Sequence, residues 1–104
     1  RKGADGKFVW PGYGENMRVL KWVVDRCEGK AGATETPLGH MPRYEDMEWH
    51  GMPGFSRAVF DELTHVDHDA WRAEVKDHDE LFNKLKSRLP AEMTAQRHAL
   101  EKAL

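Results

Sequence analysis

Three aromatic residues and one asparagine near the start of the chain have the types and spacing of a binding site for a flat ring. Phe8, Trp10 and Tyr13 are separated by proline and glycine residues, which set sharp turns and let the backbone approach a ligand closely. Two rings could stack on the faces of an aromatic heterocycle, each pair adding about 0.5–1.5 kcal/mol beyond burial. Asn16 follows, and its amide offers the donors and the acceptor needed to distinguish one base edge from another.

The same rings also have a purely structural interpretation. Large aromatic side chains are often buried, so Phe8, Trp10 and Tyr13 could close the base of the following helix as core residues. Composition does not decide between a stacking site and a core plug.

Other nucleotide-binding motifs are incomplete. Residues 12–17 begin like a dinucleotide fingerprint, but Met17 occupies the third glycine position. Neither Gly6-Lys7 nor Gly29-Lys30 is preceded by the glycine that a phosphate loop requires, and Ala31 stands where a Ser or Thr would hold magnesium. We therefore predict no Walker-type site in this chain.

We also assign no metal site and no catalytic residue. His65 and His68 straddle a predicted helix start, and His78 lies roughly three turns further along, which is a poor arrangement of ligands. Cys27, the single cysteine, lacks any motif of a nucleophile and cannot form an internal disulfide. A lone cysteine favours a reduced, intracellular setting, and we predict a cytoplasmic location.

The binding turn leads into a helix. Ala4-Asp5-Gly6 is expected to form a tight reversal within a loop over residues 1–14. Apolar residues then recur at helical spacing, and Gly29 provides the stop. Asn16 or Glu15 can cap this helix, so the predicted ligand site and the helix start coincide. The apolar residues are Met17, Leu20, Val23, Val24 and Cys27.

Residues 30–53 are predicted to form a long loop, and residues 36–42, with a proline near each end, to be extended. Its apolar anchors, together with Trp10, have few local partners. We expect them to leave a bare apolar patch, so that the chain either forms a homodimer or keeps residues 30–53 mobile. The residues in this patch are Trp10, Tyr44, Trp49 and Met52.

The remainder is predicted to be helical. Ser56 and Asp67 are expected to be the N-caps of two helices, and Pro90 should end the second and begin a third. The buried face of the long central helix is predicted to contain Trp71, Val75, His78, Phe82, Leu85 and Leu89. A weaker stripe in the last helix contains Met93, Arg97, Leu100 and Leu104.

In addition to these local patterns, the segment Gly6–Trp22 resembles the guanine-binding segment of GTP-dependent phosphoenolpyruvate carboxykinases. Gly29-Lys30, Thr36–Pro42, Trp71 and Leu89-Pro90 follow in the order that this family shows. The resemblance implies a mainly α chain with irregular extended segments, forming the C-terminal portion of a larger α/β enzyme. It assigns residues 1–104 to the nucleotide-binding domain, as a guanine-binding turn (1–16), a helix (17–29), an extended loop (30–53) and a helical tail (54–104).

The resemblance also implies a function and a site. Family members convert oxaloacetate and GTP reversibly into phosphoenolpyruvate, GDP and carbon dioxide, a carboxy-lyase reaction of gluconeogenesis that uses manganese. Two aromatic rings sandwich the guanine and an asparagine reads its edge, and these roles fall on Phe8, Tyr13 and Asn16. Tyr13 departs from the usual phenylalanine, which retains the stacking face and adds a hydroxyl. The phosphate loop, the manganese ligands and the substrate-binding arginines are expected upstream, so the chain alone should be inactive.

Composition excludes some alternatives. With 39% hydrophobic and 33% charged residues, the chain is polar for a self-contained domain, and its net charge of -2 is unlike that of a nucleic-acid-binding protein. No stretch has the length and apolarity of a membrane helix. The expected partners are a guanine nucleotide and the N-terminal part of the same enzyme. Two alternatives stay open, a non-catalytic module that binds a proline-rich peptide and a structural helical piece.

Overall fold

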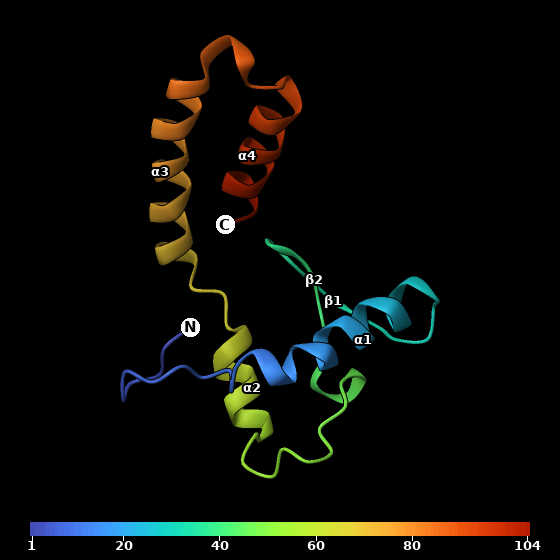
Figure 1. The fold of residues 1–104 in the computed structure, drawn as a ribbon. Helices are drawn as coiled ribbons and strands as arrows, with labels where there is room; N and C mark the ends of the chain where they lie inside the picture. Colours follow the sequence, from blue (N-terminus) through green and yellow to red (C-terminus); the bar gives the residue numbers. More distant parts are fainter. The chain divides into compact units, whose positions relative to one another are not determined.

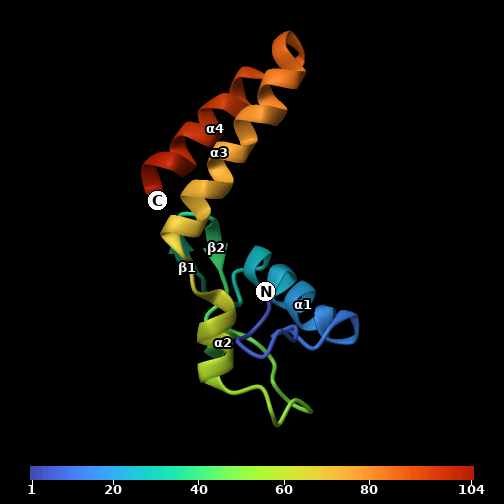
Figure 2. The ribbon, with the colours of Figure 1, turned by 90° about the vertical axis from the view of Figure 1, so that its left-hand side faces the viewer.

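The computed structural model describes residues 1–104, which divide into two compact units, Arg1–His65 and Val66–Leu104. Figures 1 and 2 show the ribbon in two views. The helices and strands are α1 (Asn16–Cys27), β1 (Thr34–Thr36), β2 (Gly39–Met41), α2 (Arg57–Thr64), α3 (His68–Leu85) and α4 (Ala91–Ala103), with short 3-10 turns over Tyr13–Glu15, Tyr44–Asp46 and Lys86–Arg88. The prediction of a mainly α chain with irregular segments is confirmed.

The first unit opens with the predicted tight reversal. Lys2 pairs with Phe8 in an antiparallel bridge, and the Gly3 N–H donates to the Lys7 carbonyl at 2.9 Å. Gly6 closes the turn with φ 76°, a left-handed conformation that glycine adopts without steric cost. This small loop places Phe8 just before the Trp10–Asn16 turn.

Helix α1 forms where the periodicity predicts it and ends at Cys27, and Gly29, two residues further on, takes a left-handed φ of 73° that stops the helix. Its apolar stripe, however, is not covered within these residues: Leu20 is 53% and Val24 54% exposed. The other side of the helix is covered instead, because the Trp22 ring is buried and its indole N–H donates to the Gly32 carbonyl at 3.1 Å. A periodic pattern thus predicted the helix but not the face that it buries in this unit.

The predicted extended segment is a hairpin rather than a continuous strand. Strands β1 and β2 pair antiparallel, with Thr36 opposite Gly39. The Thr36 hydroxyl donates to the Gly39 carbonyl at 2.8 Å and accepts the Leu38 N–H at 3.2 Å, which stabilises the two-residue turn between the strands. The prolines fixed local φ angles but did not prevent a reversal between them.

The expectation that the loop aromatic residues would be left bare is wrong. Met52, Phe55 and Phe60 form the buried core of the first unit, and other apolar side chains pack around them. The rings interlock: Trp49 stacks on Phe55 at 4.9 Å between centroids and on Tyr44 at 5.1 Å. The side chains around this core are Trp10, Tyr44, Met47, Trp49, Val59 and Leu63. The irregular segment therefore supplies its own partners, which removes the original reason for expecting mobility there.

Helix α2 completes this core. Its N-cap is the predicted Ser56, whose Oγ accepts the Val59 N–H at 3.4 Å. The helix directs Phe60, only 5% exposed, into the aromatic cluster. Its single buried residue is thus the one that meets the loop.

The second unit is a pair of helices, α3 and α4, that lie side by side in both views (Figures 1 and 2). The predicted cap Asp67 accepts the Ala70 N–H at 3.0 Å, and Val75 is 1% exposed at the centre of the predicted buried face. Helix α3 ends at Leu85, earlier than predicted, where Lys86 takes a positive φ of 49°. Leu85, the last residue of α3, is exposed, so its predicted place on the buried face is wrong.

Polar contacts also join α3 to the end of α4. His68 Nδ1 lies 2.7 Å from the Leu104 carbonyl, which also accepts from the Arg72 guanidinium. From α4, Arg97 pairs with Asp79 at 2.9 Å across the helices. None of the helices is both long and apolar enough to traverse a bilayer.

Candidate functional site

Phe8, Tyr13 and Asn16 lie in one irregular segment that leads into α1: Phe8 in the bridge with Lys2, Tyr13 at the start of the 3-10 turn and Asn16 as the first residue of the helix. Phe8 is 74% and Tyr13 91% exposed, so neither ring is a core plug. The Lys2 ammonium lies 5.6 Å from the centroid of the Phe8 ring, and the Tyr13 ring is almost entirely in solvent. Both rings are therefore accessible to a stacking partner, although Lys2 lies over one face of Phe8, whereas the Trp10 ring is partly buried.

Trp10 belongs both to the core and to the turn. Its ring packs edge-on against Phe55, with centroids 5.5 Å apart and planes at 83°. Its indole N–H donates to Oδ1 of Asn16 at 2.8 Å. Of the three rings, only Trp10 therefore has the structural role of a core residue. It also connects the aromatic core to Asn16 of the predicted site.

The first turn of α1 is held by a salt bridge and not by the predicted side-chain cap. Glu15 is the N-cap residue, but its carboxylate accepts from Nε of Arg18 at 2.5 Å and caps no backbone N–H. The other two guanidinium nitrogens of Arg18 donate to the carbonyls of Glu48 at 2.7 Å and His50 at 2.8 Å. Arg18 therefore fastens the helix start to the loop that carries the aromatic core.

Sequence reasoning gave no role to Arg18. The available signal was its position three residues after Glu15, a spacing at which opposite charges meet on a helix. Its two backbone acceptors lie about thirty residues away in sequence, and no local pattern could indicate them.

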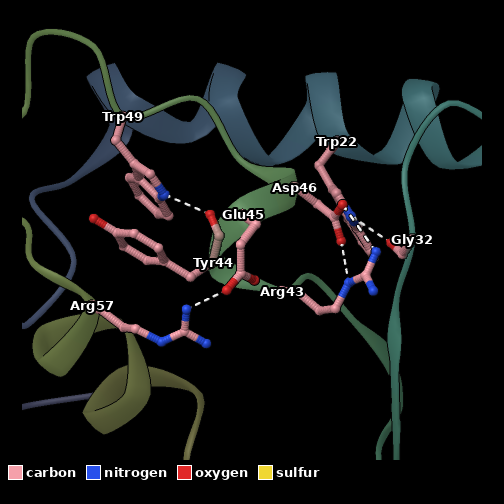
Figure 3. A network of polar contacts seen from close by, with 8 residues as sticks. All are labelled: Trp22, Gly32, Arg43, Tyr44, Glu45, Asp46, Trp49 and Arg57. Carbon is pink, nitrogen blue, oxygen red and sulfur yellow. Dashed lines mark hydrogen bonds and ion pairs between the residues drawn. The ribbon is translucent and has the colours of Figure 1, made fainter.

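A second polar network lies between α1 and the 3-10 turn Tyr44–Asp46, and Figure 3 shows it from close by. Arg43 donates from Nε and a terminal nitrogen to both carboxylate oxygens of Asp46, at 2.6 and 3.2 Å. This hydrogen bonding holds the pKa of Asp46 below its ordinary value, although burial works in the opposite direction. Trp22 meets the Gly32 carbonyl beside this pair.

The other half of the network is an ion pair between Arg57 and Glu45. The hydrogen bond from Arg57 lowers the pKa of Glu45, and the Arg57 guanidinium also lies 5.6 Å from the Tyr44 ring centroid. An open cavity of about 500 Å³ borders these residues, but each arginine in its wall is paired with a carboxylate. Phe8, Tyr13 and Asn16 do not line it, and it lacks free charge for a phosphate.

The residues of this chain do not form a metal centre. No group of three or more His, Cys, Asp or Glu side chains converges as a set of ligands. The manganese implied by the family resemblance therefore does not fit any site in these residues, and we assign no step to it through them.

Comparison with known proteins defines the class. A family model described as the phosphoenolpyruvate carboxykinase C-terminal P-loop domain matches residues 1–103. The chain is 45% identical over 100 residues to phosphoenolpyruvate carboxykinase (GTP) of Anaeromyxobacter dehalogenans strain 2CP-C, covering 96% of this chain and 17% of that protein. For the protein of the same name from Corynebacterium glutamicum strain R the identity is 44% over 101 residues, covering 97% of this chain and 16% of that protein.

A third relative, the enzyme of the same name from Arthrobacter sp. strain FB24, is 38% identical over all 104 residues, which is 17% of its length. The chain thus spans about a sixth of the curated relatives that it matches. It belongs to the GTP-dependent phosphoenolpyruvate carboxykinase family and corresponds to part of the C-terminal domain.

Proposed function

We propose that this chain is the guanine-binding part of a GTP-dependent phosphoenolpyruvate carboxykinase, with Phe8 and Tyr13 stacking on the base and Asn16 reading its edge. The observation that carries the proposal is that the two rings are exposed and that the Asn16 amide nitrogen is unpaired. Both rings are largely in solvent, and the amide nitrogen of Asn16 has no partner in the chain. Exposed rings beside an unoccupied donor at a helix start suit a base that brings both a π face and an acceptor.

In the complete enzyme the proposed reaction converts oxaloacetate and GTP into phosphoenolpyruvate, GDP and carbon dioxide. The carbon–carbon bond to the departing carboxylate breaks, and its electron pair forms the enolate. The enolate oxygen then takes the γ-phosphoryl group of GTP, while GDP leaves with the electrons of the broken phosphoanhydride bond. Such a transfer depends mainly on positioning and charge neutralisation.

The part that this chain plays in the reaction is binding and orientation. Holding the guanine fixes one end of the nucleotide, so that the γ-phosphate has a defined place relative to the enolate. We propose that the catalytic groups and manganese ligands lie in the remainder of the enzyme, that the isolated chain is inactive, and that the whole protein serves gluconeogenesis in the cytoplasm.

The exposed apolar stripe on α1 is consistent with a chain that is one part of a larger enzyme. Met17, Leu20, Val23 and Val24 are 43–68% exposed along one helix. We propose that they pack against the remainder of the carboxykinase, of which this chain spans about a sixth by comparison with its relatives. In a preparation of the 104 residues alone, this stripe would be the surface through which a second copy associates.

The test is nucleotide preference in the complete enzyme. Replacing Asn16 by Ala removes the edge contact but leaves both rings, and an unpaired partner costs about 1–3 kcal/mol. The kcat/KM ratio for GTP over ATP should therefore fall about 5- to 150-fold, with a smaller change in the rate with saturating GTP. An unchanged ratio would remove Asn16 from the site.

A further inference from the structure

We infer that Trp10 is a positioning residue for nucleotide specificity, because it fixes which end of the Asn16 amide faces the base. This inference deepens the proposed function and rests on it. Trp10 itself does not reach the base: its donor is occupied by Asn16 and its ring by the core. It acts only through the orientation of its neighbour.

The contact has one chemically consistent arrangement. An indole N–H can donate but not accept, so the amide atom that lies 2.8 Å from Nε1 of Trp10 must be the oxygen of Asn16. The two N–H donors of the amide then point away from Trp10. They have no other partner in the chain, so they are the groups left to meet a ligand.

The donor in this contact is held by the core. The Trp10 ring meets Phe55 edge-on, and Phe55 is 6% exposed and stacked on Trp49 at 4.9 Å with planes at 19°. Rotating the indole away from Asn16 would disrupt that packing. Without this hydrogen bond the exposed Asn16 amide would rotate freely. The tryptophan therefore holds the amide in one orientation before the base binds.

An outward-facing donor selects for an acceptor at position 6 of a purine. Guanine and hypoxanthine carry an oxygen there, whereas adenine carries an amino group that is itself a donor. A guanine oxygen would accept from the Asn16 amide, and an adenine amino group would leave two donors facing each other. A freely rotating amide would lose this selectivity, because it could turn its oxygen toward adenine.

The decisive variant is Trp10→Phe in the complete carboxykinase, with Trp49→Phe as the matched control. Both substitutions remove an indole N–H from the same aromatic cluster and keep a ring, but Trp49 donates to the Tyr44 carbonyl at 2.7 Å and not to Asn16. We expect Trp10→Phe to lower the kcat/KM ratio for GTP over ATP about three- to tenfold. The ratio for ITP over ATP should fall by the same factor, since ITP shares the oxygen at position 6. Trp49→Phe should leave both ratios unchanged.

Two further variants separate this inference from the proposed function. If Asn16→Ala lowers the GTP preference but Trp10→Phe does not, the positioning role is wrong and the guanine site stands. If neither variant alters the preference, Asn16 does not read the base, and the edge contact of the proposed guanine site is wrong as well as the positioning role of Trp10. If Trp10→Phe fails to fold, Asn16→Asp tests the outward donor on which the inference depends, because it keeps an acceptor for Trp10 and puts oxygen in place of that donor. It should reduce the GTP preference below that of Asn16→Ala, and an equal effect of the two would overturn the inference.

Discussion

Helix α1 and the irregular segment of residues 44–55 contrast in what they bury. The helix carries a regular apolar stripe that stays exposed, whereas the segment has no periodicity and forms most of the core. The difference lies in size and in partners. Trp49 and Phe55 are large enough to stack on each other across a loop, while Leu20 and Val24 on a helix need a separate surface to pack against. In this unit, an apolar side chain is therefore buried where other side chains can pack against it, and not simply where the sequence has helical periodicity.

The largest effect on stability that this comparison predicts is from shortening a buried aromatic side chain in the 104-residue chain. Phe60→Ala should lower the free energy of unfolding of the first unit by about 3–5 kcal/mol, because it opens a cavity beneath Tyr44 and Trp49. Leu20→Ala, on the exposed stripe, should cost no more than about 0.5 kcal/mol. Urea unfolding followed by tryptophan fluorescence measures both. Similar losses for the two variants would show that α1 buries its stripe after all.

The second prediction concerns the same stripe in the complete carboxykinase. Leu20→Glu should leave the 104-residue chain nearly unaffected but destabilise the complete enzyme by about 2 kcal/mol or more, since a carboxylate would be placed in an apolar contact. Lys21→Glu is the neighbouring control, because it also places a carboxylate on α1, at an exposed side chain whose hydrogen bond is to Asp25. Thermal unfolding of both proteins gives the comparison. Equal tolerance of Leu20→Glu in the two would contradict a docking role for the stripe.

Local rules predicted the helices well. Ser56, Asp67 and Gly29 mark helix ends through contacts within a few residues, so sequence patterns are sufficient to place them. The hairpin over residues 34–41 was missed because its turn depends on hydrogen bonds of Thr36 and not on an Asn-Gly type signal.

The candidate site was predicted only in part. Residue types and spacing indicated Phe8, Trp10, Tyr13 and Asn16, the family resemblance assigned the base contacts to Phe8, Tyr13 and Asn16, and these roles stay predictions. The contact between Trp10 and Asn16 spans six residues across an irregular turn, so neither helical nor strand periodicity could indicate it. The exposed stripe on α1 could not be predicted either, because its exposure depends on which surfaces the other residues provide.

The smallest effect expected is on the pH dependence of stability, through the Arg43–Asp46 ion pair at the start of the irregular segment. The pKa of Asp46 is lower in the folded chain than its unfolded value of about 3.9, so its stabilising contribution is complete at about pH 5, well above the unfolded pKa, and is lost as the pH falls toward and through the folded pKa. The difference in urea midpoint between the parent chain and Asp46→Asn should therefore shrink between about pH 5 and about pH 3. A difference that stays constant over this range would show that Asp46 does not titrate with a lowered pKa.

The most direct test of the central claim is a crystal structure of the complete carboxykinase with GDP bound. We expect the guanine to lie between the rings of Phe8 and Tyr13, with its oxygen at position 6 within hydrogen-bonding distance of the Asn16 amide nitrogen and the amide oxygen still on Trp10. Guanine bound away from these residues, or an Asn16 amide turned with its oxygen toward the base, would contradict this model of recognition.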